Sequence, residues 1–335
     1  MTELIKLGHG AGGLLTARLI REVFLRRLPD QELARLNDSA LLPLPTGDRL
    51  AFTTDGFVVD PYRFPGGDIG KLAVYGSVND LAVMGATPLY LSTAYIIEEG
   101  FPITELTEIV DSLAEAAEQA GVKVVTGDTK VVERGGADGI FITTAGVGIV
   151  PAGVDLSAEN VQPGDVVIVN GPIGEHGIAV LSQREGLKFE TPVLSDCAPL
   201  NTLLQGLPER FPGIRYMRDA TRGGVATVVK EMAVSSGTDI FLVEDDLPVR
   251  PAVAAACELL GLDPLYLANE GRVVMVVDGE VARDVLAVLQ AHPLGAGAAI
   301  IGQVTTGAGN AFLRTGLGGT KFLDLLVGEQ LPRIC

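Results

Sequence analysis

Five aspartates stand where an apolar strand ends or inside an apolar helix: Asp38 in LNDSALL, Asp55 in FTTDGF, Asp80 in GSVNDLAVMGA, Asp128 in VVTGDTK and Asp219 in MRDATRGG. Asp80 is the most unusual, because Leu81, Ala82, Val83 and Met84 follow it directly. A buried lone carboxylate is costly unless it is paired or binds a metal. Any one of these acids alone is better explained as a cap or turn residue. Five together favour an oxygen-rich Mg²⁺ site beside phosphate groups.

The segment GHGAGG, residues 8–13, has four glycines in six positions. Glycine allows positive φ and close backbone approach, so Gly10, Gly12 and Gly13 are candidates to wrap phosphates with their N–H groups. The segment is not a Walker loop, because no GK[ST] follows it, and it lacks the preceding strand of a dinucleotide fingerprint. A flexible N-terminal turn explains it equally well.

The three cysteines, Cys197, Cys257 and Cys335, are odd in number and far apart, without a CxxC or Cys/His cluster. A zinc site or a disulfide framework is therefore not expected. Cys257 lies in the apolar pattern VAAACELLG and is expected in the core. Cys335 is the last residue of QLPRIC, where no following element exists to pack it, so we interpret it as a reactive thiol on a mobile arm.

Composition limits the classes of function. A chain of 335 residues with 47% apolar residues suits two domains with ample core. The net charge of −17 argues against nucleic acid and anionic membranes as partners. No apolar run approaches the roughly 18–20 residues that cross a bilayer. The N-terminus shows no signal pattern, and we expect a cytoplasmic protein.

Sequence patterns predict the elements that must position these residues. In the first half they indicate a strand pair or one long strand entering a loop over 49–59, a helix over 67–85 and a strand over 88–97. They also indicate an amphipathic helix over 103–120 between Pro102 and Gly121, and strands over 122–129 and 139–150. After a break at 151–164, they indicate strands over 165–171, 239–243, 272–279 and 297–304, with helices over 174–186, 196–206 and 222–236. We expect an α/β (α+β) fold: an N-terminal mixed-sheet domain (1–155), a C-terminal α/β domain (156–321) and a flexible tail (322–335).

The motifs TTDGFVVDP, GSVNDLAVMGA, TGDTKVV, VQPGDVVIVNGPIGEHGIAVL and RDATRGG, in this order, resemble the aminoimidazole ribonucleotide synthetase-like superfamily. Its members include selenophosphate synthetase, thiamine monophosphate kinase and the hydrogenase maturation family HypE. The ending PRIC is typical of the HypE branch. The resemblance covers nearly the whole chain, and it implies ATP binding in the N-terminal domain and a homodimer formed through the N-terminal sheets.

The resemblance also implies an enzyme, an ATP-dependent carbamoyl dehydratase. A carbamoyl group, delivered by the carbamoyltransferase HypF, would be carried on Cys335 and dehydrated to a thiocyanate. Phosphorylation by ATP would turn the carbamoyl oxygen into a leaving group. The cyanide would pass to iron on a HypC–HypD complex, for the [NiFe]-hydrogenase centre.

Residue roles follow from matching motifs. Asp38, Asp55, Asp80, Asp128 and Asp219 correspond to Mg²⁺ ligands. The first four of them, with Asn79, Gly10, Gly12 and Gly13, form the expected ATP site. Glu270 in LANEGR is the expected proton acceptor, and Lys130 is expected to compensate charge or relay a proton near Cys335. Glu270 is also explained as a turn residue and Lys130 as a surface charge. His176 fits a structural or capping role better than a catalytic one, whereas His9 fits either.

Two alternatives stay open. Another ATP-dependent enzyme of the superfamily would not need the last four residues, and selenophosphate synthetase would carry a cysteine or selenocysteine near the glycine segment, where this chain has none. A non-catalytic nucleotide-binding scaffold would use the tail only as a docking peptide.

Overall fold

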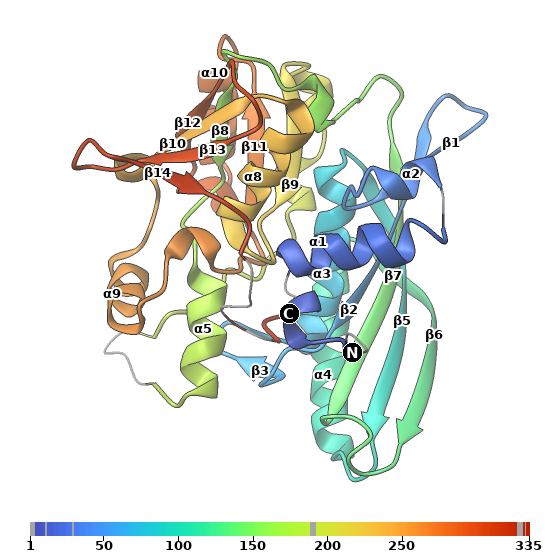
Figure 1. The fold of residues 1–335 in the computed structure, drawn as a ribbon. Helices are drawn as coiled ribbons and strands as arrows, with labels where there is room; N and C mark the ends of the chain where they lie inside the picture. Colours follow the sequence, from blue (N-terminus) through green and yellow to red (C-terminus); the bar gives the residue numbers. More distant parts are fainter. Residues whose placement is uncertain (1–3, 11, 29, 188–191, 327–330, 332) are drawn as a thin grey trace.

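The computed structural model describes residues 4–10, 12–28, 30–187, 192–326, 331 and 333–335, which form two α/β units lying side by side (Figure 1). The first unit contains α1 (Leu14–Leu19), α2 (Gln31–Ala34), β1 (Ala40–Pro43), β2 (Arg49–Phe57), β3 (Arg63–Phe64), β4 (Gly67–Asp68), α3 (Ile69–Val83), β5 (Thr87–Glu98), α4 (Ile103–Ala120), β6 (Lys123–Val132) and β7 (Ile140–Val150). The second contains β8 (Val166–Val169), α5 (Glu175–Arg184), α6 (Asn201–Leu204), α7 (Leu207–Arg210), β9 (Ile214–Asp219), α8 (Gly224–Ser236), β10 (Asp239–Val243), α9 (Pro251–Leu260), β11 (Val273–Val277), α10 (Ala282–Gln290), β12 (Ala299–Thr305), β13 (Ala311–Arg314) and β14 (Thr320–Leu323).

Each unit is built on its own mixed sheet. The first sheet has the order β1-β2-β7-β5-β6, in which β5 and β6 run parallel and the other pairs antiparallel. The second has the order β14-β13-β10-β12-β8-β11-β9. The predicted α/β class is thereby confirmed. None of the helices in the described ranges is long and apolar enough to span a bilayer.

Helix α3 joins the two units. The Asp68 carboxylate caps its first turn by accepting the N–H groups of Gly70 and Lys71, at 2.7 and 3.1 Å. Gly85, at φ +77°, turns the chain after its end. Thirteen of its fifteen residues are buried. A helix that is apolar on all sides belongs inside a core.

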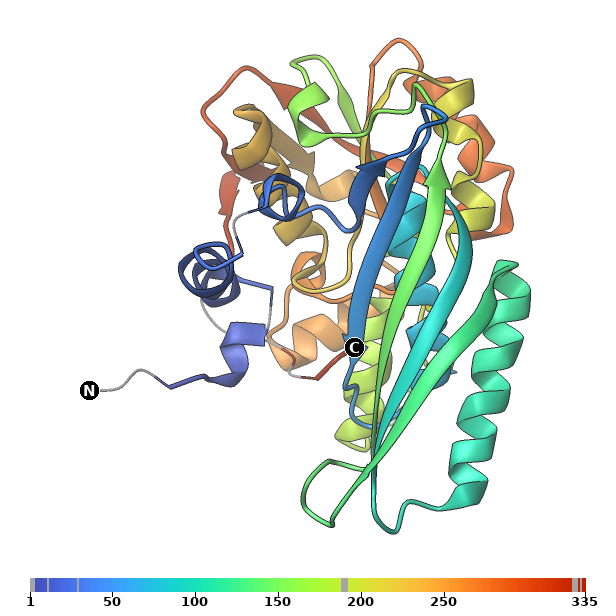
Figure 2. The ribbon, with the colours of Figure 1, turned by 90° about the vertical axis from the view of Figure 1, so that its right-hand side faces the viewer.

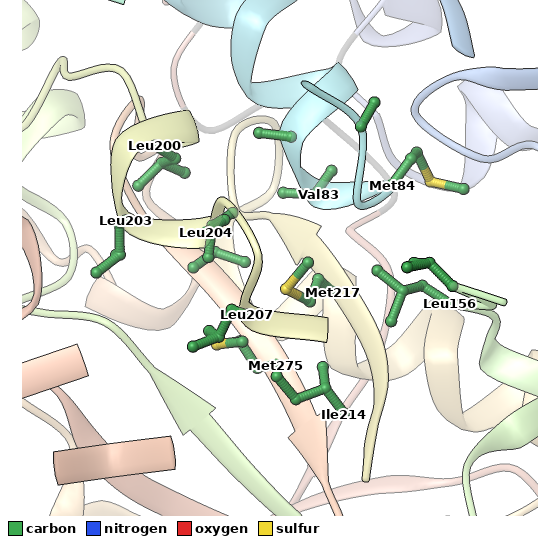
Figure 3. Close-up of a cluster of buried hydrophobic side chains, with 14 of the residues drawn as sticks. Val83, Met84, Leu156, Leu200, Leu203, Leu204, Leu207, Ile214, Met217 and Met275 are labelled. Carbon is green, nitrogen blue, oxygen red and sulfur yellow. The ribbon is translucent and has the colours of Figure 1, made fainter. Parts of the chain in front are cut away.

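The end of α3 packs into a core that both units share (Figure 3). Val83 and Met84 belong to this core together with Leu204 of α6, Leu207 of α7 and Met217 of β9. Because this core is closely packed, the acids of the first unit hold a defined position relative to those of the second.

One face of the first sheet is covered by α3 and α4, and no described helix covers the other (Figure 2). On this open face Phe52 of β2 and Tyr90 of β5 both pair with Val147 of β7. Phe52 is 45% exposed and Tyr90 46%. The three form an apolar stripe across the open face.

The tail differs from the prediction. Its expected start at 322 falls inside β14, and its end lies against the body of the protein. Val58 donates its N–H to the Cys335 carbonyl at 3.0 Å, and Asp60 donates to that of Arg333 at 3.1 Å. The expectation that the tail has no element to pack against is wrong, because the backbone after β2 offers free donors and the first unit's core accepts Ile334. Residues 327–330 and 332 lie outside the described ranges.

Candidate active site

Three of the predicted acids converge. Oxygen atoms of Asp38, Asp80 and Asp219 lie within 4.8 Å of one another. Asp38 precedes β1, Asp80 belongs to α3 and Asp219 ends β9, so both units contribute. Packing of α3 against β2 and β9 brings these residues together despite their separation along the chain.

The acidic cluster fits a hard divalent cation. Burial, reinforced by the charges of Asp219, Asp55 and Asp38, raises the pKa of Asp80 well above its ordinary value. Burial and the neighbouring Asp38 do the same to the pKa of Asp219. Carboxylate oxygens gathered at this spacing are the ligands that Mg²⁺ prefers, and a bound cation would favour their ionised forms.

Neighbouring polar groups hold the cluster in place. The Thr53 hydroxyl donates to Asp80 Oδ2 at 2.6 Å, and Ser39 Oγ donates to the Asp80 carbonyl at 3.1 Å. Arg218 Nε lies 3.1 Å from Asp38 Oδ1. Sequence reasoning missed all three, since nothing local distinguishes a serine, threonine or arginine that orients a carboxylate.

Asp55 lies at the edge of this cluster and faces Arg222. Its Oδ1 accepts the N–H of Gly56 at 2.8 Å and lies 3.8 Å from Arg222 Nη2. Arg222 Nη1 also donates to the Gly10 carbonyl at 3.4 Å. Arg222 was missed as a site residue, although it stands in the quoted motif RDATRGG. A guanidinium here suits phosphate or carboxylate groups.

The glycine segment packs between Arg222 and the beginning of the tail. Gly12 has φ +78°, and a Cβ on it would lie 3.0 Å from Arg222 Cβ. A Cβ on Gly13 would lie 2.2 Å from the Leu326 carbonyl oxygen, which accepts the N–H of Leu14. The close approach therefore requires glycine at both positions. Its phosphate-binding role stays a prediction.

The Cys335 thiol lies at this site. It lines a cavity of about 180 Å³ together with Gly10, Arg222 and Arg333. Burial raises the pKa of the thiol to about 12; Arg222 opposes this rise, whereas Glu270 and Asp55 add to it. The docked thiol is thus held in its neutral form.

Glu270 is buried near the Cys335 thiol, with 3% of its surface exposed. Its Oε1 has no hydrogen-bond partner among the described residues. Burial, with the charges of Asp219 and Asp196, raises the pKa of Glu270 well above its ordinary value. Asp196 accepts the N–H groups of Glu270 and Gly271 at 3.1 and 3.2 Å and so fixes the backbone of the loop that carries Glu270. Sequence reasoning also missed Asp196.

The amide of Asn79 makes hydrogen bonds within the protein, and its predicted part in ATP binding stays a prediction. Its Nδ2 donates to the carbonyls of Ala198 and Glu270, each at 3.1 Å, and its Oδ1 accepts the N–H of Leu200 at 2.7 Å. Because these bonds occupy the amide, Asn79 links α3 to the second unit and positions the Glu270 backbone.

Asp128 and Lys130 do not join the site within one chain. They lie on β6, the edge strand, and pair with each other at 2.6 Å. Both side chains are about two-thirds exposed, at 62% and 67%. Within one chain the pair matches the alternative interpretation of Lys130 as a surface charge.

The two histidines that the sequence analysis considered, His9 and His176, lie in different surroundings. His9 Nδ1 accepts the Lys6 N–H at 3.0 Å, within its own turn. His176 is fully buried and its Nε2 lies 2.7 Å from the Ile334 carbonyl. The structure therefore gives His176 a contact with the tail.

Comparison with known proteins identifies the family. The N-terminal domain of AIR synthase related proteins matches residues 36–150, and their C-terminal domain matches residues 162–313. Carbamoyl dehydratase HypE of Cupriavidus necator is 50% identical over 332 residues, covering 99% of this chain and 95% of the relative. The chain belongs to the HypE family of carbamoyl dehydratases. The predicted family is confirmed, and with it the prediction of an enzyme.

Solved structures of the HypE family share the fold. A HypE chain in a HypE–HypF complex superposes with a TM-score of 0.87 at 47% identity, covering 92% of this chain and 99% of that one. A HypE in complex with ATP superposes with a TM-score of 0.83 at 45% identity, covering 99% and 100%.

Proposed function

We propose that this protein uses ATP to dehydrate a carbamoyl group carried on Cys335, which produces a protein thiocyanate. The observation that carries the proposal is the docked tail: the Cys335 thiol lies in a cavity beside Arg222 and its pKa responds to Glu270, Asp55 and Asp219. This arrangement supports a single site that contains both the substrate's attachment point and the acidic cluster.

The reaction balances as protein-S–C(=O)NH₂ + ATP → protein-S–C≡N + ADP + phosphate + H⁺. The carbamoyl oxygen takes the γ-phosphoryl group, the C–O bond breaks and phosphate leaves. The nitrogen loses both protons as the C≡N bond forms. Glu270 is the proposed acceptor of one of them, because its Oε1 is buried and unpartnered among the described residues. The departing phosphate takes up the other.

Asp38, Asp80 and Asp219, with Asp55 at the edge, would hold Mg²⁺ and the phosphates of ATP. Bound Mg²⁺ neutralises the charge that develops during phosphoryl transfer. A HypE crystallised with ATP supports nucleotide binding by this family. Arg222 and the segment from Gly10 to Gly13 would stand beside the phosphates.

The neutral form of the docked thiol indicates the position of the tail in which Cys335 receives the carbamoyl group. Only the thiolate is a good nucleophile, and burial disfavours it at the docked position. We therefore propose that loading occurs while the tail is extended to a donor protein, HypF; a solved HypE–HypF complex supports this choice of partner. The later acceptor is a HypC–HypD complex, and the location is the cytoplasm.

We further propose a homodimer. The apolar stripe formed by Phe52, Val147 and Tyr90 lies on a sheet face that no described helix covers. A second copy, pairing through the same face, would remove this surface from water. Asp128 and Lys130 lie on the edge strand of that sheet, so any part they take in catalysis is a prediction about the dimer.

The test is the intact mass of the protein. Incubation with HypF, carbamoyl phosphate and ATP should first add one carbamoyl group at Cys335. Because this incubation contains ATP, the carbamoyl form is isolated by desalting early in the time course. Fresh ATP and Mg²⁺ should then remove the mass of one water, whereas a non-hydrolysable ATP analogue should not. Cys335→Ala should show neither change.

The alternatives predict other results. A different ATP-dependent enzyme of the superfamily would keep its full ATP turnover when Cys335 is replaced by alanine. A scaffold would show no ATP-dependent mass change. It would also lose no ATP turnover in Asp80→Ala, because it has none. An unmodified wild-type protein after incubation with active HypF would refute the proposal.

A further inference from the structure

We propose that His176 is the positioning residue that latches the tail, holding the Cys335 thiol at the site and leaving the Glu270 carboxylate unpartnered. The inference rests on the function proposed above and adds a residue to it. His176 is the second residue of α5 in the second unit, and its side chain is fully buried between the tail and the Glu270 loop.

Two hydrogen bonds determine which ring nitrogen carries the proton. Nε2 lies 2.7 Å from the Ile334 carbonyl, which can only accept, so Nε2 is the donor. Nδ1 lies 2.8 Å from Ser195 Oγ. Burial lowers the pKa of His176, which favours the neutral ring and makes Nδ1 the acceptor from Ser195. Ser195 Oγ accepts the N–H of Cys197 at 3.1 Å and is thereby oriented toward the ring.

The same ring faces Glu270. His176 Nε2 lies 3.9 Å from Glu270 Oε1, too far for a hydrogen bond while Ile334 holds the proton donor. When the tail leaves, His176 Nε2 loses the Ile334 carbonyl as its acceptor. A small movement of either side chain would then bring Nε2 within hydrogen-bond distance of the Glu270 carboxylate. Docking of the tail therefore frees Glu270, and release of the tail allows His176 to bind it.

Other contacts also hold the tail: Val58 of the first unit donates its N–H to the Cys335 carbonyl at 3.0 Å, and further contacts lie at Arg333. Arg184 Nη2 donates to the Arg333 carbonyl at 2.8 Å, and Arg333 pairs with Asp138 on the first unit. Ile334 is the residue next to Cys335, so its carbonyl sets the direction in which the thiol enters the cavity. His176 is the side chain that binds this carbonyl.

The first experiment measures alkylation of Cys335 by iodoacetamide, followed by peptide mass spectrometry, without nucleotide or partner. His176→Phe keeps an aromatic ring against Phe64, whose centroid lies 5.2 Å from that of His176, but removes the donor. Loss of one hydrogen bond should speed alkylation about fivefold. His176→Gln has a donor nitrogen at the same number of bonds from Cα and should restore the wild-type rate.

The matched control is His292→Phe, which alters a partly buried histidine that caps a turn in the second unit through Leu294. It should leave alkylation of Cys335 unchanged. Equal rates for wild type, His176→Phe and His176→Gln would overturn the latch, and so would a failure of His176→Gln to restore the rate that His176→Phe changes.

The second experiment separates the two half-reactions. Loading by HypF requires the extended tail and should be as fast or faster in His176→Phe. Dehydration of the isolated carbamoyl form requires the docked tail and should slow at least fivefold. A general folding defect would slow both steps, and that result would also count against the latch.

The two proposals fail separately. An absent thiocyanate in the wild type, with alkylation still dependent on the donor at position 176, would refute the function and keep the latch. Normal dehydration with alkylation independent of that donor would refute the latch alone.

Discussion

Burial favours the neutral forms of both Glu270 and Cys335 while the tail is docked. A proton acceptor must be ionised, so the raised pKa of Glu270 makes its ionisation dependent on nearby positive charge. Arg222 lowers the pKa of Glu270, and a cation on the acidic cluster would act in the same direction. The ionisation of each group at this site therefore depends on the charges of its neighbours.

Glu270→Gln keeps the size of the side chain but removes the acceptor. We expect dehydration of the carbamoyl form to slow by about a hundredfold or more, because general acid–base catalysis contributes about 10²–10⁴. Loading of Cys335 by HypF should be unaffected. Single-turnover mass spectrometry measures both, with the exposed Glu258→Gln on α9 as the control. Unchanged dehydration would exclude Glu270 as the acceptor.

Asp80→Asn should stabilise the metal-free protein. The folded-state pKa of Asp80 is raised, so the carboxyl destabilises the fold at pH values above its unfolded pKa, including neutral pH. A gain of about 1 kcal/mol would raise Tm by about 2–4 °C.

Added Mg²⁺ should reverse this order of stability. It should stabilise the wild type and have a much smaller effect on Asp80→Asn, because the variant has lost one of three converging carboxylates. Calorimetry at neutral pH, with and without Mg²⁺, measures both effects. Equal responses to Mg²⁺ would show that the ion binds elsewhere.

Among the elements, α3 has the greatest influence on the site. It carries Asp80 toward the acidic cluster and uses Asn79 to hold the Glu270 loop. Its end is fixed by the close packing of Gly85, on which a Cβ would lie 2.7 Å from Val154 Cγ1. Helix α4 ends at Gly121 with a similar φ of +69°, but a Cβ there would meet nothing within 4 Å.

These two glycines allow a matched stability test. Gly121→Ala should cost about 1–2 kcal/mol, from the left-handed backbone alone. Gly85→Ala should cost measurably more, because the added methyl also collides with Val154. Urea unfolding of both variants gives the comparison. A loss in Gly85→Ala no larger than that in Gly121→Ala would show that the end of α3 relaxes freely.

At the scale of the whole molecule, one face of the first sheet carries an apolar stripe that no described helix covers, and two predicted site residues lie on that sheet's edge strand. Phe52→Lys with Tyr90→Lys introduces two like charges into the stripe. If the face pairs with a second copy, this variant should be a monomer by light scattering.

Dehydration by the monomeric variant should also fall, if β6 of the partner subunit completes the site. Leu317→Lys, at a fully exposed position in the second unit, is the control and should keep the wild-type mass. A double variant with the same mass as the wild type would refute pairing through this face.

The sequence alone determined the local elements and the types of group at the site. The helix over 103–120 was predicted with the bounds that the structure has, because apolar periodicity, Pro102 and Gly121 all act within a few residues. The family was correctly predicted from motif order and the PRIC ending.

Only the tertiary structure decided which of these residues meet. Asp38, Asp80 and Asp219 converge, whereas Asp128 lies apart on an edge strand, although all four looked alike in sequence. The docked tail and its contact with His176 likewise depend on packing between distant segments. Local patterns reflect neighbours along the chain, but proximity in space follows from how α3 and the two sheets share a core.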